Sequence, residues 1–151
     1  MGKLILKNIT PFFIFEMANN HMGSLEHGLK IIREIHESCS NYPYVFGFKL
    51  QYRQLDTFIH PDYRDRFEYK YVKRFSETRL EKEEFKCLID AIKNYGFISV
   101  CTPFDEESVD LLEGHNVDVV KIASCSSTDW PLIERIVKTD KPIIISTAGI
   151  S

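Results

Sequence analysis

Short apolar runs and amphipathic runs alternate along the chain, in an order that predicts strands separated by helices. Five apolar runs are expected to form strands, at residues 11–18, 44–51, 97–102, 117–124 and 141–149. Four runs with apolar residues three and four positions apart are expected to form helices, at residues 24–39, 81–96, 105–115 and 127–140. Ser24 is the expected N-cap of the first helix, and Pro131 falls in the first turn of the last.

The order of these elements predicts parallel strands. Each connection between successive strands contains a helix or has room for one, and such crossovers join parallel strands in a right-handed sense. The strands are nearly continuous apolar runs, as expected when both faces of a sheet are covered. We therefore expect an α/β fold, either an open doubly wound sheet or part of a TIM-type (β/α) barrel. The chain has no G-x-G-x-x-G motif after the first strand and no P-loop, which disfavours a dinucleotide-binding fold.

Polar residues gather at the same end of all the predicted strands. Because side chains alternate along a strand, Lys49 and Gln51 share one face, opposite Phe48 and Leu50. In a parallel sheet the carboxyl ends of the strands lie together, and in barrels that rim holds the site. The strand ends are therefore predicted to direct one set of side chains at a single cavity: Glu16, Lys49, Gln51, Thr102, Lys121, Ser124 and Ser146.

The residue types in this set favour an anionic ligand. Two lysines supply charge, while hydroxyls and an amide supply directional hydrogen bonds, and together these suit phosphate or carboxylate. An ammonium in a dry site needs a bound anion or a partner such as Glu16. The alternative is that Lys49 and Lys121 form structural ion pairs with buried carboxylates. Asn20 and His21 either line the rim beside Glu16 or belong to a polar turn that caps the first helix.

The stretch from Arg53 to Arg79 is long for a connection, and it is rich in Tyr, Phe, Arg and Asp. That composition favours an ordered lid or substrate loop, the alternative being a surface excursion without a role. The net charge of −3 over 151 residues indicates no nucleic-acid-binding surface, and no apolar run is long enough to span a membrane. Without a signal-peptide pattern, a cytoplasmic location is expected. The four cysteines lack zinc-type spacing and are expected to be buried free thiols.

Five segments, in order, resemble the N-acetylneuraminate (sialic acid) synthase family. They are FEMANNHMGSLEHGLKII (15–32), FKLQ (48–51), FISVCTPFDEESVDLL (97–112), VDVVKIASCSSTDWPLI (117–133) and KPIIISTAGIS (141–151). The resemblance implies that residues 1–151 are the N-terminal part, about five strands, of an eight-stranded (β/α)₈ barrel. It also implies a transferase of carbohydrate biosynthesis. Such an enzyme condenses phosphoenolpyruvate with an N-acylated amino sugar, such as N-acetylmannosamine, to a nine-carbon 2-keto acid and releases phosphate.

The resemblance also implies roles for the predicted residues. Glu16 would lie near the reacting carbons, where it could stabilise positive charge or orient water. The other six strand-end residues would hold phosphoenolpyruvate, the two lysines as catalytic groups and the rest as substrate-binding groups, with Asn20 and His21 beside them. The family uses a divalent metal, Mn²⁺ or Mg²⁺, whose ligands are expected outside this chain. The complete enzyme is expected to be a homodimer.

Three departures from the family pattern are visible. Ser126 stands where the family has a Glu that is associated with the amino sugar, and NYPYVFGFKLQ (41–51) replaces a small Gly-Ala turn. The family's later strands, with its metal-binding histidines, and its C-terminal antifreeze-like domain are not among these residues, so we expect little or no turnover from them alone. Two alternatives stay open. One is a Schiff-base aldolase on the same barrel, with Lys49 or Lys121 as nucleophile. The other is a truncated, non-catalytic paralogue that binds an anion.

Overall fold

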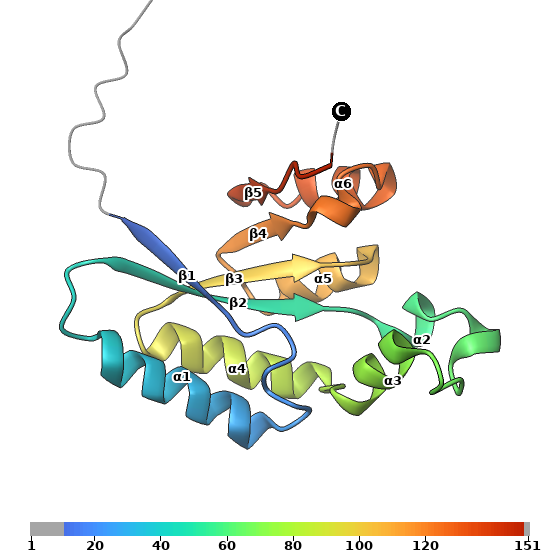
Figure 1. Ribbon diagram of the computed structural model, residues 1–151. Coiled ribbons are helices and arrows are strands. Elements are labelled where there is room, and N and C mark those ends of the chain that lie inside the picture. The colour runs from blue at the N-terminus through green and yellow to red at the C-terminus, as the bar shows by residue number, and fades with distance from the viewer. Residues whose placement is uncertain (1–10, 150–151) are drawn as a thin grey trace, which may run out of the picture.

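The computed structural model describes residues 11–149, which form one sheet of parallel strands with helices beside it. The strands lie in chain order across the sheet, whereas an open doubly wound sheet reverses its strand order partway. Figure 1 shows the sheet curling through successive strands, as in part of a barrel. The prediction of about five strands of a TIM-type barrel is therefore confirmed. The strands are β1 (Phe12–Glu16), β2 (Val45–Tyr52), β3 (Ile98–Pro103), β4 (Val119–Ile122) and β5 (Ile143–Ile145).

Four helices connect the strands and cover the outer face of the sheet (Figure 1). They begin and end within three residues of the predicted boundaries. The Ser24 hydroxyl accepts a hydrogen bond from the His27 amide at 3.2 Å, so this residue caps the first helix as expected. Pro131 lies in the first turn of the last helix, also as expected. The helices are α1 (Leu25–Cys39), α4 (Lys82–Asn94), α5 (Glu106–Gly114) and α6 (Trp130–Val137).

The core lies between the outer face of the sheet and these helices. Alternate residues of β2, namely Phe48, Leu50 and Tyr52, are at most 1% exposed. The apolar face of α4 packs against them through Phe85, Leu88, Ile89 and Ile92, the four residues predicted to point inward. Each such side chain contributes about 1.5–3 kcal/mol when fully buried. This packing fixes which face of each strand is outer, and it leaves the opposite face for the polar residues.

The stretch from Arg53 to Arg79 is ordered, as predicted, and lies beyond the carboxyl end of β2 (Figure 1). It contains α2 (Leu55–Phe58), a 3₁₀ turn η1 (Pro61–Tyr63) and α3 (Lys70–Glu77). The Arg79 guanidinium donates to both carboxylate oxygens of Asp56 at 3.0 Å, which joins the two ends of the stretch. Asp105 caps α5 by accepting from the Ser108 amide at 2.7 Å and also accepts from the Gln54 amide at 2.9 Å. The excursion is therefore anchored to the barrel.

Two sequence expectations about burial and membranes can be compared with the structure. Cys101 is buried and Cys39 is partly buried, but Cys87 and Cys125 are exposed, so the expectation of buried thiols is wrong for the last two. Cys87 lies on α4, but the buried face of this helix is formed by other residues, such as Leu88 and Ile89. Its position in an amphipathic helix was therefore not enough to predict its burial. Between residues 11 and 149, each helix is too short or too polar to cross a bilayer.

Candidate anion-binding site

The inner face of the sheet gathers most of the predicted polar side chains. In the strand register Glu16 lies beside Lys49, and Gln51 beside Thr102. Lys121 lies beside Ile144, two residues before Ser146, whose backbone amide donates to the Ile122 carbonyl at 3.1 Å. Neighbours in register point to the same side of a parallel sheet. The structure thus places six predicted residues on one face: Glu16, Lys49, Gln51, Thr102, Lys121 and Ser146.

The two lysines have different partners. Lys49 forms an ion pair with Glu16, and its side chain is 15% exposed against 46% for Glu16. Lys121 donates to the Ile122 carbonyl at 2.9 Å and to the Ser146 hydroxyl, and none of the carboxylates described lies within 4.0 Å of it. Burial, followed by the nearby Lys49 ammonium, lowers the pKa of Lys121, and Glu16 opposes this shift. Lys49 thus has an ion-pair partner, although this carboxylate is exposed and not buried as that alternative required, and Lys121 has none within 4.0 Å among the residues described.

Thr102 adds an unsatisfied hydroxyl to the same face. Its side chain is 1% exposed, and its Oγ1 atom is buried without a hydrogen-bond partner among residues 11–149. A buried polar atom without a partner costs about 1–3 kcal/mol. A hydrogen bond to a ligand oxygen would remove that cost. In the described part of the chain, the inner face therefore has two ammonium groups and an unpaired hydroxyl, but one carboxylate, which pairs with Lys49.

The remaining predicted residues lie at the edges of this face. Ser124 begins the short 3₁₀ turn η2 (Ser124–Ser126) directly after β4 and is exposed, with its carbonyl accepting from the Ser127 hydroxyl at 2.7 Å. Asn20 is also exposed, and its side chain donates to the Glu16 carbonyl at 3.4 Å. Neither forms a hydrogen bond with a lysine in the described part of the chain. Ser126, at the position of the family Glu, is 7% exposed.

His21 is buried and belongs to the turn that precedes α1. It is 1% exposed, its Nδ1 accepts from the Gly23 amide at 3.2 Å, and its ring meets Phe85 edge-on. Burial lowers the pKa of His21. A neutral ring whose Nδ1 is an acceptor carries its proton on Nε2. His21 therefore combines the turn role with a place on the wall of a cavity shared with Gln51.

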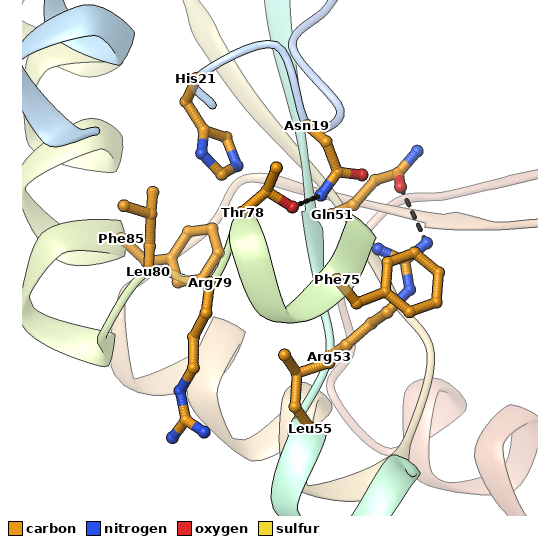
Figure 2. Close-up of a pocket in the computed structure, with 10 residues that line it drawn as sticks. All are labelled: Asn19, His21, Gln51, Arg53, Leu55, Phe75, Thr78, Arg79, Leu80 and Phe85. Carbon is orange, nitrogen blue, oxygen red and sulfur yellow. Dashed lines mark hydrogen bonds between the residues drawn. The ribbon is translucent and has the colours of Figure 1, made fainter. Parts of the chain in front are cut away.

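That cavity, shown in Figure 2, has a volume of about 30 Å³ and connects the inner face with the excursion. Asn19 lines it and donates to the Thr78 hydroxyl at 2.6 Å. Arg53 lines it as well and donates to the Gln51 side-chain oxygen at 2.9 Å. The sequence reasoning missed Arg53, although the alternation that relates Lys49 to Gln51 continues to it.

The divalent metal implied by the resemblance finds no ligand set in residues 11–149. No three His, Cys, Asp or Glu side chains in this range are grouped so that they could hold a metal ion. Glu16 is the carboxylate that contacts a lysine of this face, and it is already paired with that lysine, Lys49. These residues do not fit a metal centre by themselves, and no chemical step is assigned to a metal held by them.

Comparison with known proteins gives consistent matches. Residues 47–151 match the NeuB family. A pseudaminic acid synthase from Campylobacter jejuni is 26% identical over 90% of this chain and 40% of its own length. The chain spans about 40% of the length of the curated relatives it matches.

Two solved structures share the fold closely. One carries the name spore coat polysaccharide biosynthesis protein E, from Chromobacterium violaceum, and is 60% identical with a TM-score of 0.91. The alignment covers 93% of this chain and 42% of that one. The other is N-acetylneuraminic acid synthetase from Leptospira borgpetersenii in complex with citrate, which is 26% identical with a TM-score of 0.77. That alignment covers 95% of this chain and 46% of the synthetase.

Proposed function

The chain belongs to the NeuB family, and we therefore propose that it forms the phosphoenolpyruvate-binding part of a sugar-acid synthase. The whole enzyme would condense phosphoenolpyruvate with an N-acylated amino sugar, such as N-acetylmannosamine, and release phosphate. Relatives named pseudaminic acid synthase and N-acetylneuraminic acid synthetase support this class of reaction. A cytoplasmic location, a homodimer, and Mn²⁺ or Mg²⁺ held by ligands outside these residues belong to the same proposal.

One observation carries the assignment of phosphoenolpyruvate to this face. Among residues 11–149, Glu16 pairs with Lys49 alone, and Lys121, which has no carboxylate within 4.0 Å in this range, also has a lowered pKa. A ligand with phosphate and carboxylate groups supplies the missing negative charge. Such a ligand is then held by Lys49 and Lys121 through charge, and by Gln51, Thr102 and Ser146 through directional hydrogen bonds.

The proposed reaction places Glu16 next to the carbon that becomes positive. The methylene carbon of phosphoenolpyruvate attacks the aldehyde carbon of the sugar, a carbon–carbon bond forms, and the aldehyde oxygen takes up a proton. The phosphate-bearing carbon becomes cationic and is captured by water, which loses a proton. The bond from this carbon to the bridging oxygen then breaks and phosphate leaves, taking the proton that the new hydroxyl gives up, so water supplies the keto oxygen. The Glu16 carboxylate, held by Lys49, stabilises the cation and orients that water.

The test is phosphate release by the natural full-length protein. We expect release only when phosphoenolpyruvate and an N-acylated amino sugar are both present. Trapping of a pyruvate adduct on Lys49 or Lys121 by borohydride would instead favour the Schiff-base aldolase, because the proposed reaction forms no covalent adduct. Phosphoenolpyruvate binding without phosphate release, with any such sugar, would favour the non-catalytic paralogue.

A further inference from the structure

We propose that Arg53 is a positioning residue that fixes the orientation of the Gln51 side-chain amide, so that its NH₂ group is presented to the bound anion. The proposal rests on the proposed function, since phosphoenolpyruvate is taken as that anion. It also assigns a role to the excursion, because Phe75 of α3 contacts the Arg53 guanidinium. The supporting observations are the two ring contacts of the guanidinium and, within residues 11–149, its one hydrogen bond and the absence of a carboxylate within 4.0 Å.

The Arg53 guanidinium lies within cation–π distance of two aromatic rings. Its central carbon is 3.8 Å from the centre of the Phe104 ring and 4.4 Å from that of Phe75 (Figure 2 shows Phe75 beside it). Phe104 follows β3 directly, whereas Phe75 belongs to α3 in the excursion. Contact with two rings from different elements restricts the movement of the guanidinium.

The edge of the guanidinium contacts Gln51. Arg53 Nη2 donates to Gln51 Oε1 at 2.9 Å. Arginine can only donate, so the amide oxygen must face it and the NH₂ group must point away. Gln51 lies two residues beyond Lys49 and beside Thr102 on the inner face. A rigid arginine thus converts an amide that could present either atom into a fixed donor, which an anion requires.

Arg53 occupies a costly environment for a purely structural residue. Burial lowers its pKa to about 10 although the Asp105 carboxylate opposes the shift, and its Nε atom is buried without a hydrogen-bond partner. Within residues 11–149 it has no carboxylate within 4.0 Å. Arg66, in the same excursion, is an arginine near aromatic rings whose charge is both solvated and paired. It lies near the rings of Tyr63 and Tyr69, remains half-exposed, and is bound to the Glu68 carboxylate at 2.6 Å. The unpaired charge of Arg53 therefore points to function.

The experiment measures phosphoenolpyruvate affinity and KM with the natural full-length protein. Arg53→Lys removes the planar guanidinium that contacts the two rings, and a flexible ammonium no longer holds the Gln51 amide in one orientation. We therefore expect KM for phosphoenolpyruvate to rise about 10-fold, the scale of one charged hydrogen bond. Phe75→Leu, which keeps apolar volume but loses the ring, should raise it about 2- to 5-fold, as expected for loss of one cation–π contact. Arg66→Lys is the matched control and should leave KM unchanged. Melting temperatures identify any variant that fails to fold.

A double-mutant cycle separates positioning from other roles. In a Gln51→Ala protein there is no amide to orient, so Arg53→Lys should cost little further affinity. An equal loss from Arg53→Lys in both backgrounds would overturn the proposal, because it would mean that Arg53 binds the anion itself or acts only on stability. If the unaltered protein does not bind phosphoenolpyruvate, the proposed function and this inference fail together. Normal binding with an equal loss overturns this inference alone.

Discussion

At the amino end of the sheet, Lys93, Asp118 and Ser99 form a closed set of polar contacts. The Lys93 ammonium is 3.0 Å from one Asp118 oxygen, and the other oxygen accepts from the backbone amide and hydroxyl of Ser99 at 2.9 and 2.6 Å. At the carboxyl end, Lys121 has no carboxylate among the residues described and the Thr102 hydroxyl has no partner. Polar groups satisfied within the protein stabilise the fold, whereas unsatisfied ones are free to bind a ligand.

The largest expected effect comes from removing the Lys121 ammonium at the carboxyl end. Lys121→Met should lower phosphoenolpyruvate-dependent phosphate release by about 10²–10³, as for loss of a charged group at a reacting centre. The ligand-free protein should melt at the same temperature or higher, because the charged lysine carries a desolvation cost in the folded state. Steady-state kinetics and thermal melting check both parts. Lys93→Met should behave in the opposite way, with lower stability and normal activity, and a loss of activity there would erase the contrast between the two ends.

The second effect is on stability, at the amino end. Asp118→Asn should lower the free energy of unfolding by about 1–2 kcal/mol, because Ser99 and Lys93 lose a charged acceptor. Burial raises the pKa of Asp118, but the hydrogen bonds from Ser99 and then Lys93 outweigh it, so the net pKa is lowered. The stabilisation is present above the unfolded pKa of about 3.9 and is lost as pH falls through the lower folded pKa. Denaturant titrations should thus show that the free energies of unfolding of the unaltered and Asp118→Asn proteins converge in acid. A constant difference at every pH would contradict this.

The pH dependence of ligand binding sharpens the comparison further. The pKa of Lys121 is lowered, so its ammonium is lost at a less alkaline pH than for an ordinary lysine, whose pKa is about 10.4. Phosphoenolpyruvate affinity should fall about tenfold by one pH unit above that lowered pKa, where only about a tenth of the groups stay charged. Calorimetric titration across the alkaline range measures it. In the Lys121→Met protein this fall should disappear, and its persistence would assign the titration to another group.

The smallest effect is expected at Thr102. Thr102→Val keeps the shape of the side chain and removes the unpaired hydroxyl. Phosphoenolpyruvate affinity should fall by about 2- to 10-fold, as for one neutral hydrogen bond, with unchanged or slightly greater stability. Ser99→Ala serves as the control at the other end, because its hydroxyl already donates to Asp118 and should affect stability only. An unaltered affinity in Thr102→Val would remove this hydroxyl from the site.

The sequence was sufficient to predict which strand-end residues share a face, but not which residues of the excursion contact Arg53. Alternation along β2 separates Lys49 and Gln51 from Phe48 and Leu50, and the parallel order brings the other strand ends beside them. Nothing local tells that Phe75, far along the chain, stacks on Arg53. That contact depends on how the excursion folds back, which is decided by tertiary packing and not by spacing.

Local patterns also left the turn before α1 undecided. Asn19, Asn20 and His21 are adjacent polar residues, and their sequence does not say which ones turn inward. The structure buries His21, places Asn19 against Thr78 and leaves Asn20 exposed. The backbone decides this, because Ala18 and Met22 both have positive φ angles and redirect the chain on either side of the three residues.

The excursion is fastened at its two ends: Asp56 meets Arg79, Gln54 meets Asp105, and Thr78 meets Asn19. Residues 59–73 lie between these contacts in the sequence. Replacements there would change the surface of the excursion without removing the contacts that anchor it. Such an arrangement lets this outer surface diverge in sequence while the strand ends remain unchanged.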